Sequence, residues 1–106
     1  TTPPRLLHFR GGELVINRTL ARVFLRGNEV PLSPMEYNLL LFLAERAGHV
    51  IPPEELYNAI WGPGGGVDPR QVKWYIWRLR QKIEDDPAHP RFICTERGRG
   101  YYFAPE

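Results

Sequence analysis

The sequence has one cysteine and no apolar run long enough to span a membrane. Cys94 has no second thiol to pair with, so a disulfide framework is excluded and a reducing compartment, the cytoplasm, is expected. No secretory signal peptide is visible, and nothing predicts contact with a membrane. The chain opens on Thr-Thr-Pro-Pro without a methionine, which is typical of a linker. We predict a linker over residues 1–5 and one domain with a modest core over residues 6–106.

Catalytic and metal-binding patterns are missing as well. No nucleophile with a neighbouring base stands out, and there are no paired carboxylates in an apolar setting. The glycine-rich residues 62–66 lack the lysine and the preceding strand that a phosphate-binding P-loop requires. His8, His49 and His89 share no metal-ligand spacing. We therefore expect no enzyme, no metal and no cofactor.

Acidic residues are absent from one long stretch, residues 69–82, although the net charge of the chain is only +2. The same stretch holds five cations, which are Arg70, Lys73, Arg78, Arg80 and Lys82. Asp68 can cap a helix here, Pro69 suits its first position, and Gln71 can reach back to the cap. The sequence thus predicts a helix over residues 68–84.

One face of this helix is apolar and the opposite face is basic and aromatic. Spacings of four, three and four residues join the apolar positions, Val72, Ile76, Leu79 and Ile83, into one buried seam. The other side carries Arg70, Trp74, Trp77, Arg78 and Gln81. A helix with this division is suited to lie against phosphates and bases.

Strands and helices are also predicted on either side of the basic helix. Runs of β-branched and large apolar residues predict an antiparallel meander with strands at 6–9, 13–16, 21–25 and 30–32. The turns between them are expected at residues that tolerate positive φ, which are Gly11-Gly12, Asn17-Arg18 and Gly27-Asn28. A capping box at residues 33–36 begins a first helix that ends before Gly48, and Pro52-Pro53 begins a second that ends at Gly62. Strands at 92–95 and 101–103 would form a hairpin whose tip carries two glycines and two arginines.

Separated motifs in a specific order extend this interpretation. They are Glu36 followed by Leu40-Leu41, then Trp61-Gly62, then the run from Val72 to Ile83 with Arg78-Leu79-Arg80, and finally Thr95-x-Arg97-Gly98-x-Gly100-Tyr101-x-Phe103. Together they resemble the OmpR/PhoB-type DNA-binding domain of bacterial two-component response regulators. The resemblance implies an α+β winged helix-turn-helix fold, with a four-stranded antiparallel sheet, a three-helix bundle and a β-hairpin wing. It also implies sequence-specific binding of double-stranded DNA by the output domain of a phosphorelay transcription regulator.

The resemblance assigns roles to individual residues and segments. The helix at 68–84 would enter the major groove, and the wing at 92–103 the minor groove. Base-reading residues would be Arg78, Trp74 and Gln71; contacts to the DNA backbone would come from Arg70, Arg80, Trp61, Thr95 and Tyr101; Arg97 and Arg99 would serve the minor groove. A receiver domain would precede this one, paired domains would bind tandem half-sites as a dimer on DNA, and the loop at 62–67 would face RNA polymerase.

Some residues depart from the family pattern or allow other interpretations. Pro52-Pro53 replaces the usual Ser-Arg start of the second helix and removes one expected cap and one expected phosphate contact. A tryptophan such as Trp61 is more often core than contact, and for Trp77 the sequence does not distinguish DNA from a neighbouring protomer. A winged helix that docks a protein or RNA, with Trp74 and Trp77 as anchors, is the main alternative. Binding to phosphates would weaken steeply as salt rises, whereas aromatic docking would not.

Overall fold

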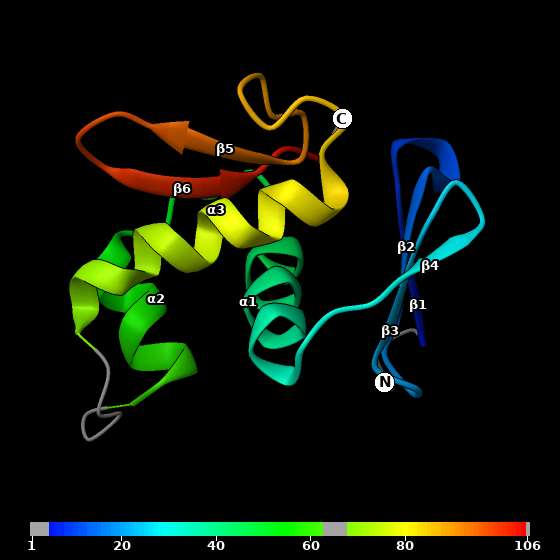
Figure 1. Ribbon diagram of the computed structural model, residues 1–106, viewed down its shortest axis with the longest axis horizontal. Helices are drawn as coiled ribbons and strands as arrows, with labels where there is room; N and C mark the ends of the chain where they lie inside the picture. Colours follow the sequence, from blue (N-terminus) through cyan, green and yellow to red (C-terminus); the bar gives the residue numbers. More distant parts are fainter. Residues whose placement is uncertain (1–4, 63–67, 106) are drawn as a thin grey trace.

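The computed structural model describes residues 5–62 and 68–105, and its elements follow the order of a winged helix (Figure 1). The elements are β1 (Leu6–Phe9), a 3-10 turn (Arg10–Gly12), β2 (Leu14–Asn17), β3 (Arg22–Leu25), β4 (Asn28–Val30), α1 (Pro34–Glu45), α2 (Pro53–Ile60), a 3-10 turn (Pro69–Gln71), α3 (Val72–Ile83), β5 (Ile93–Glu96) and β6 (Gly100–Phe103). The predicted fold class is confirmed. Most of the predicted linker, residues 1–4, lies outside the described residues.

The four N-terminal strands form an antiparallel meander in the order β1-β2-β3-β4. Ile16 is paired with Leu7 on one side and with Val23 on the other, so these residues lie in register across three strands. Ile16 and Val23 are buried, which turns one face of the sheet toward the helices. The strand bounds differ by one or two residues from the predicted ones except for β1, where they agree.

Two of the three predicted turns of the meander have positive φ at the expected glycines, Gly11-Gly12 and Gly27, and one does not. Arg26 and Gly27 form the two-residue turn between β3 and β4, both at positive φ (50° and 83°), which suits the twist of a hairpin. Between β2 and β3 the positive φ falls on Ala21 (54°), not on Asn17-Arg18, so that prediction was wrong. Asn17 instead accepts a hydrogen bond from the Leu20 amide at 3.0 Å, as turn-forming asparagines do.

The first two helices begin as the sequence predicts. The Ser33 hydroxyl accepts from the Glu36 amide at 3.2 Å, and the Glu36 carboxylate accepts from the Ser33 amide at 2.8 Å, which completes the capping box of α1. Pro52 is the N-cap of α2 and offers no side-chain hydrogen bond. The structure therefore confirms that α2 lacks a side-chain cap, as Pro52-Pro53 predicted.

The basic helix differs from its prediction in its first turn. Residues Pro69–Gln71 are a 3-10 turn, and the α-helix runs only from Val72 to Ile83. Asp68 does cap the start, because its carboxylate accepts from the Arg70 amide at 2.9 Å. Within the described part of the chain, the side chain of Gln71 makes no bond back to the cap, so only half of the predicted capping arrangement is formed.

The far end of α3 is tied to the wing by a buried carboxylate. Glu84 accepts from the backbone amides of Arg91, Phe92 and Ile93 at 2.7, 3.0 and 2.8 Å. Each of these donors would otherwise need a partner in a region with little access to water. Glu84 therefore fixes where β5 begins relative to α3.

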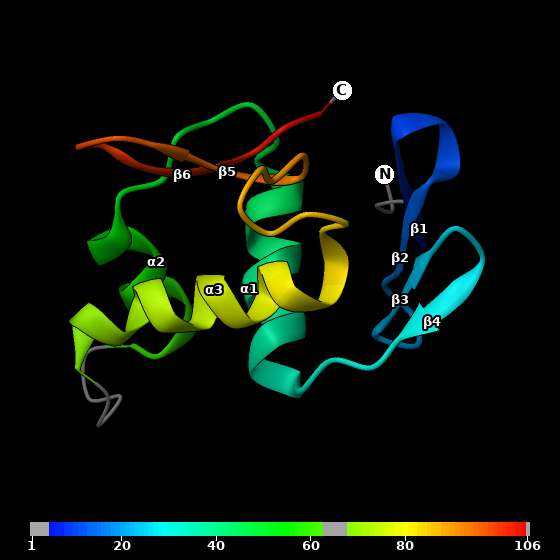
Figure 2. The ribbon, with the colours of Figure 1, turned by 45° about the horizontal axis from the view of Figure 1, so that its top comes forward.

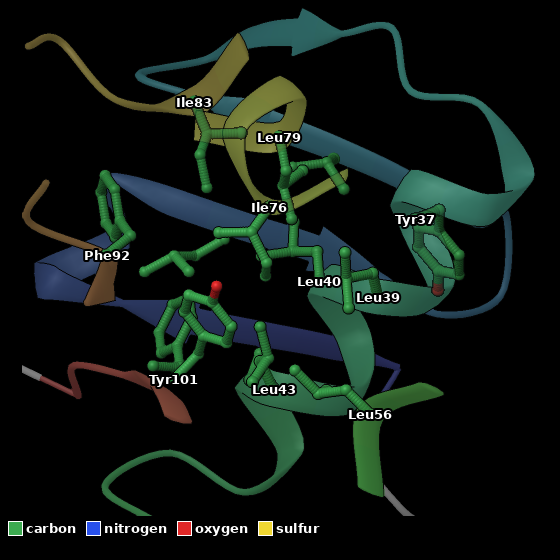
Figure 3. Close-up of a cluster of buried hydrophobic side chains, with 14 of the residues drawn as sticks. Tyr37, Leu39, Leu40, Leu43, Leu56, Ile76, Leu79, Ile83, Phe92 and Tyr101 are labelled. Carbon is green, nitrogen blue, oxygen red and sulfur yellow. The ribbon is translucent and has the colours of Figure 1, made fainter. Parts of the chain in front are cut away.

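One hydrophobic core joins the sheet, the helices and the hairpin (Figure 3). The predicted seam of α3 is confirmed, since Val72, Ile76, Leu79 and Ile83 are at most 2% exposed. Ile76 of α3 and Leu40 of α1 point toward one another in Figure 3. Figures 1 and 2 show α3 crossing α1, with its C-terminal end toward the sheet and the hairpin alongside it. None of the helices in the described ranges is long and apolar enough to cross a membrane.

Ion pairs fasten the sheet to the segment after α3. Arg26, in the β3–β4 turn, donates to Asp85 at 2.9 Å, and Arg91 donates to Glu13 at 3.0 Å. Hydrogen bonding to Arg26 lowers the pKa of Asp85, and hydrogen bonding to Arg91 lowers the pKa of Glu13. Isolated surface pairs contribute little, but this network links segments far apart in the sequence and fixes the sheet against the helical part.

Candidate nucleic-acid interface

The outward face of α3 exposes two indole rings among cations. Trp74 is 47% exposed and Trp77 is 55% exposed, which is unusual for large apolar side chains. Lys73 and Gln81 are also exposed on this helix. The prediction that the side opposite the seam faces solvent is confirmed.

Arg78 uses only the Nε edge of its guanidinium for a hydrogen bond within the described residues. Its Nε donates to Oε2 of Glu36 at 3.1 Å, and its Cζ lies 5.0 Å from the centre of the Trp74 ring. The side chain is 44% exposed. Within residues 5–62 and 68–105 its two Nη groups donate to no acceptor, so the edge that could form a bidentate contact is available.

Glu36 gathers several donors at the start of α1. Besides Arg78 it accepts from Lys82 at 2.7 Å, and its residue is only 1% exposed. Burial alone would raise the pKa of the carboxyl, but hydrogen bonds from Lys82, the backbone and Arg78 outweigh burial and lower the pKa from 4.5 to about 2. Glu36 is therefore a buried anion that holds two cations of α3 on the side facing α1.

A row of aromatic rings connects α2 to α3. Trp61 stacks on Tyr57 with ring centres 5.6 Å apart, and on its other side it packs against Tyr75 at 5.0 Å. Tyr75 meets Trp74 edge-to-face at 4.9 Å. Trp61 is only partly exposed, and its indole Nε1 is buried without a partner among the described residues. The structure thus places Trp61 mainly in the packing between the helices.

Arg70 and Gln71 lie at the exposed start of the helix. The Arg70 guanidinium is paired with Asp68 at 2.6 Å, yet its side chain is 90% exposed. Hydrogen bonding to Arg70 lowers the pKa of Asp68 to about 2. Arg70, Gln71, Trp74 and Tyr75 together line a surface pocket. A phosphate at this site would compete with Asp68 for Arg70.

Arg80 joins α3 to the wing. Its Nε donates to the carbonyl of Ile93 at 2.9 Å, its Nη2 donates to the Thr95 hydroxyl at 2.7 Å, and its Cζ lies 5.8 Å from the ring centre of Tyr101. Tyr101 is only 8% exposed, and burial raises its pKa. Three of the residues predicted to contact the DNA backbone thus lie together where α3 meets the wing; they are Arg80, Thr95 and Tyr101.

The wing has an exposed tip and a fixed base. Arg97, Gly98 and Arg99 are exposed between β5 and β6. Tyr101 exchanges backbone hydrogen bonds with Ile51 at 2.7 and 3.0 Å, which anchors β6 to the segment before α2. The predicted minor-groove arginines form no ion pair with the other residues that the structure describes, and both are exposed to a ligand. Of the loop predicted to face RNA polymerase, residues 62–67, only Gly62 lies within the described residues.

The family of C-terminal domains described as "Transcriptional regulatory protein, C terminal" matches residues 27–103. The chain belongs to this family. The KDP operon transcriptional regulatory protein KdpE of Escherichia coli is 45% identical over 84 residues, which cover 78% of this chain and 37% of that protein. The chain thus corresponds to little more than a third of that relative's length.

Solved structures of similar proteins share the fold. The response regulator DrrB of Thermotoga maritima, an OmpR/PhoB homologue, is 44% identical with a TM-score of 0.86, over 94% of this chain and 44% of that chain. The RstA DNA-binding domain of Klebsiella pneumoniae, solved in complex with the RstA box, is 35% identical with a TM-score of 0.85, over 97% of this chain and 100% of that chain.

Sequence reasoning missed two features of this regulatory domain. Glu36 was noted only as a helix cap and a family motif, and its pairing with Arg78 and Lys82 was not predicted. The acid at the third helical position is a local signal for the cap, but nothing local indicates partners more than 40 residues away. The ring contact of Tyr75 with Trp61 was also missed, because it depends on how α2 packs against α3.

Proposed function

We propose that this domain binds double-stranded DNA in a sequence-specific manner, with α3 in the major groove and the β5–β6 wing in the minor groove. The observation that carries the proposal is the outward face of α3, which combines exposed cations and indole rings without a single acid between residues 69 and 82. A relative with the same fold was solved on its DNA box, which supports this use of the fold. The family implies a regulatory rather than a catalytic role.

Arg78 is the proposed base reader. Gln71, at the N-cap of α3, is followed by Trp74 and Arg78 at spacings of three and four residues, so the three form one stripe. Gln71 and Trp74 complete the proposed base-reading set. The free Nη edge of Arg78 has the geometry for a bidentate contact with the O6 and N7 acceptors of guanine. Lys82 continues this stripe four residues after Arg78, but its ammonium group donates to Glu36.

The proposed backbone contacts flank this stripe. Arg70 is exposed and would leave Asp68 for a phosphate, whereas Arg80 would offer only the N–H groups not used by Ile93 and Thr95. The remaining members of the proposed set are Thr95, Tyr101 and Trp61. At the wing tip, Arg97 and Arg99 would enter the minor groove, where a narrow A·T-rich tract concentrates negative potential.

The proposal also includes domains and partners outside this chain. We propose that a receiver domain precedes this one and that a phosphorelay acts upstream of its output. The Escherichia coli relative is long enough for a further domain, since the chain covers 37% of it. Paired domains would occupy tandem half-sites, and the loop at 62–67 would meet RNA polymerase. A bacterial regulator must reach the genome, so we propose that the protein acts in the cytoplasm.

Two arginine variants test the division between the grooves. Arg78→Ala should cost about 1–3 kcal/mol of binding free energy and relax preference at one or two base pairs, because a major-groove base edge distinguishes all four pairs. Arg97→Ala should weaken binding by a similar order but flatten only an A·T preference beside the core site. Both variants are measured against a library of randomised sites at fixed salt. A uniform loss of affinity for Arg78→Ala would make this residue a phosphate contact.

Salt dependence separates this function from aromatic docking. A site selected from random DNA should lose on the order of a hundredfold in affinity between about 50 and 200 mM salt if about four phosphates are neutralised. The matched measurement uses single-stranded RNA of the same sequence. Affinity that does not change with salt, or that favours the RNA, would contradict the proposal.

A further inference from the structure

The guanidinium of Arg78 lies between two side chains of different character. Its Nε donates to the buried carboxylate of Glu36 at 3.1 Å, and its Cζ lies 5.0 Å from the centre of the Trp74 ring. A cation near the face of an indole is attracted by the negative potential of the ring. The carboxylate and the indole therefore restrain the same charged group, each through a different interaction.

Trp74 is itself held in place. Tyr75 meets it edge-to-face, with ring centres 4.9 Å apart and ring planes at 85°. Tyr75 in turn packs against Trp61 at 5.0 Å, and Trp61 stacks on Tyr57 of α2. Edge-to-face and offset contacts of this kind are the favoured arrangements of aromatic pairs. The indole beside Arg78 is the last of a row of rings that starts in α2.

These contacts explain how a helix surface can keep an arginine ordered in solvent. A free arginine side chain has many rotamers, and ordering it at the moment of binding reduces affinity. Arg78 is 44% exposed, so solvent alone would leave it free to move. Before any ligand arrives, Glu36 accepts from its Nε and the Trp74 ring lies beside its guanidinium.

We propose that Trp74 is a positioning residue for Arg78, holding the guanidinium with Glu36 so that its Nη edge is presented to a guanine before DNA binds. The inference rests on the proposed function, in which Arg78 reads a base. It refines the place of Trp74 in the proposed base-reading set, because Trp74 would affect specificity through Arg78 and not by touching a base itself. A direct contact between Trp74 and a base is the alternative that the experiment separates.

The experiment is a double-mutant cycle read out on a library of randomised DNA sites. Trp74→Ala should lower affinity for the selected site about three- to tenfold and flatten preference at the same base pair as Arg78→Ala. In the Arg78→Ala background, adding Trp74→Ala should change little. Trp74→Phe keeps a ring face and should restore most of the loss, whereas Trp74→Leu keeps apolar area alone and should not.

Trp77→Ala is the matched control, because it removes an indole of similar exposure three residues further along α3. Within the described ranges, the cation–π contact of Arg78 is with Trp74 and not with Trp77. It should leave the preference at the Arg78 base pair intact. A second measurement needs no DNA: the NMR signal of the Arg78 Nε–H should lose its ring-current shift in Trp74→Ala and keep it in Trp77→Ala. Unchanged melting temperatures confirm that the variants fold.

Three outcomes would overturn the inference in distinguishable ways. An equal loss from Trp74→Ala with and without Arg78, or a changed preference at another base pair, would make Trp74 a direct DNA contact. A base preference that depends on Arg78 but not on Trp74 would refute the positioning role and leave the proposed function standing. If Arg78→Ala alters no base preference at all, the base-reading assignment fails and the positioning role fails with it.

Discussion

At the scale of single residues, Glu36 has the widest influence on the proposed interface. It caps α1 through the Ser33 amide at 2.8 Å and holds Arg78 and Lys82 of α3. A buried anion is favourable only where hydrogen bonds and opposite charges replace the lost water, and here both are present. One carboxylate thus links the start of α1 to the proposed base reader.

Glu36→Gln should reveal this link through the pH dependence of stability. The pKa of Glu36 is lowered from 4.5 to about 2, so its stabilising effect is fully present above about pH 4.5 and is lost as the pH falls toward 2. At pH 7 the variant should be about 1–3 kcal/mol less stable, because hydrogen bonds to a charged group are lost. Toward pH 2 the two proteins should converge. Urea unfolding at a series of pH values measures the difference.

The matched control for this titration is Glu96→Gln. Glu96 is exposed, and its side chain has no ion pair within the described part of the chain. Its variant should track the wild type at every pH. A difference between Glu36→Gln and the wild type that stays constant from pH 7 to pH 3 would show that the charge of Glu36 does not contribute to stability.

At the scale of elements, the sequence predicted the features that depend on residues close together in the chain. The capping box of α1 and the seam of α3 depend on spacings within a few residues, and both are present in the structure. The 3-10 start of α3 was not predictable, because Asp68 can cap an α-helix or a 3-10 turn equally well. In the proposed interface, the exposed face was predicted, whereas the pairing of Arg78 with Glu36 depends on the packing of α1 against α3.

The two glycines of the hairpin also differ in whether nearby residues or tertiary packing determine their role. Both have positive φ, 78° at Gly98 and 148° at Gly100, and the sequence treated both as parts of a flexible tip. A Cβ at Gly98 would meet nothing within 4 Å, but one at Gly100 would lie 2.1 Å from the carbonyl oxygen of Ile51. Gly100 is therefore part of the fixed base of the wing, and only Gly98 belongs to the tip.

Alanine at each glycine should separate binding from folding. Gly98→Ala should cost about 1 kcal/mol of stability from its strained backbone, and it should weaken DNA binding more than this, because Arg97 and Arg99 are displaced. Gly100→Ala should destabilise the domain by about 3 kcal/mol or more, because backbone must move to admit the new methyl group. Thermal unfolding and DNA titration of the same samples measure both effects. Equal losses of stability at the two positions would contradict this division.

At the scale of the whole molecule, the proposed DNA contacts gather on α3 and the wing, away from the four-stranded sheet. The sheet lies beyond the C-terminal end of α3 in both ribbon views (Figures 1 and 2). The pairs of Arg26 with Asp85 and of Arg91 with Glu13 hold it there. A domain organised in this way can contact DNA with one part while its sheet remains available to a neighbouring protein.

The size of the domain sets its behaviour on DNA. The structure extends 34 × 31 × 25 Å, which is close to the length of one turn of B-DNA. A single module of this kind buries about 600–1,000 Å² of protein surface on DNA, too little for tight binding alone. Two copies one turn apart would stand next to each other on the same side of the duplex without overlapping.

The domain should therefore bind one half-site weakly and two half-sites much better when their centres are about 10–11 bp apart. Inserting about 5 bp between the half-sites turns the second copy to the opposite side of the duplex, so that contact between copies is lost and joint occupancy should disappear. Restoring a full turn with about 10 bp puts both copies on one side again but separates them, so here too the copies should bind only independently. Gel-shift titrations on the three spacings measure this, and affinity that does not depend on spacing would show that each domain binds DNA alone.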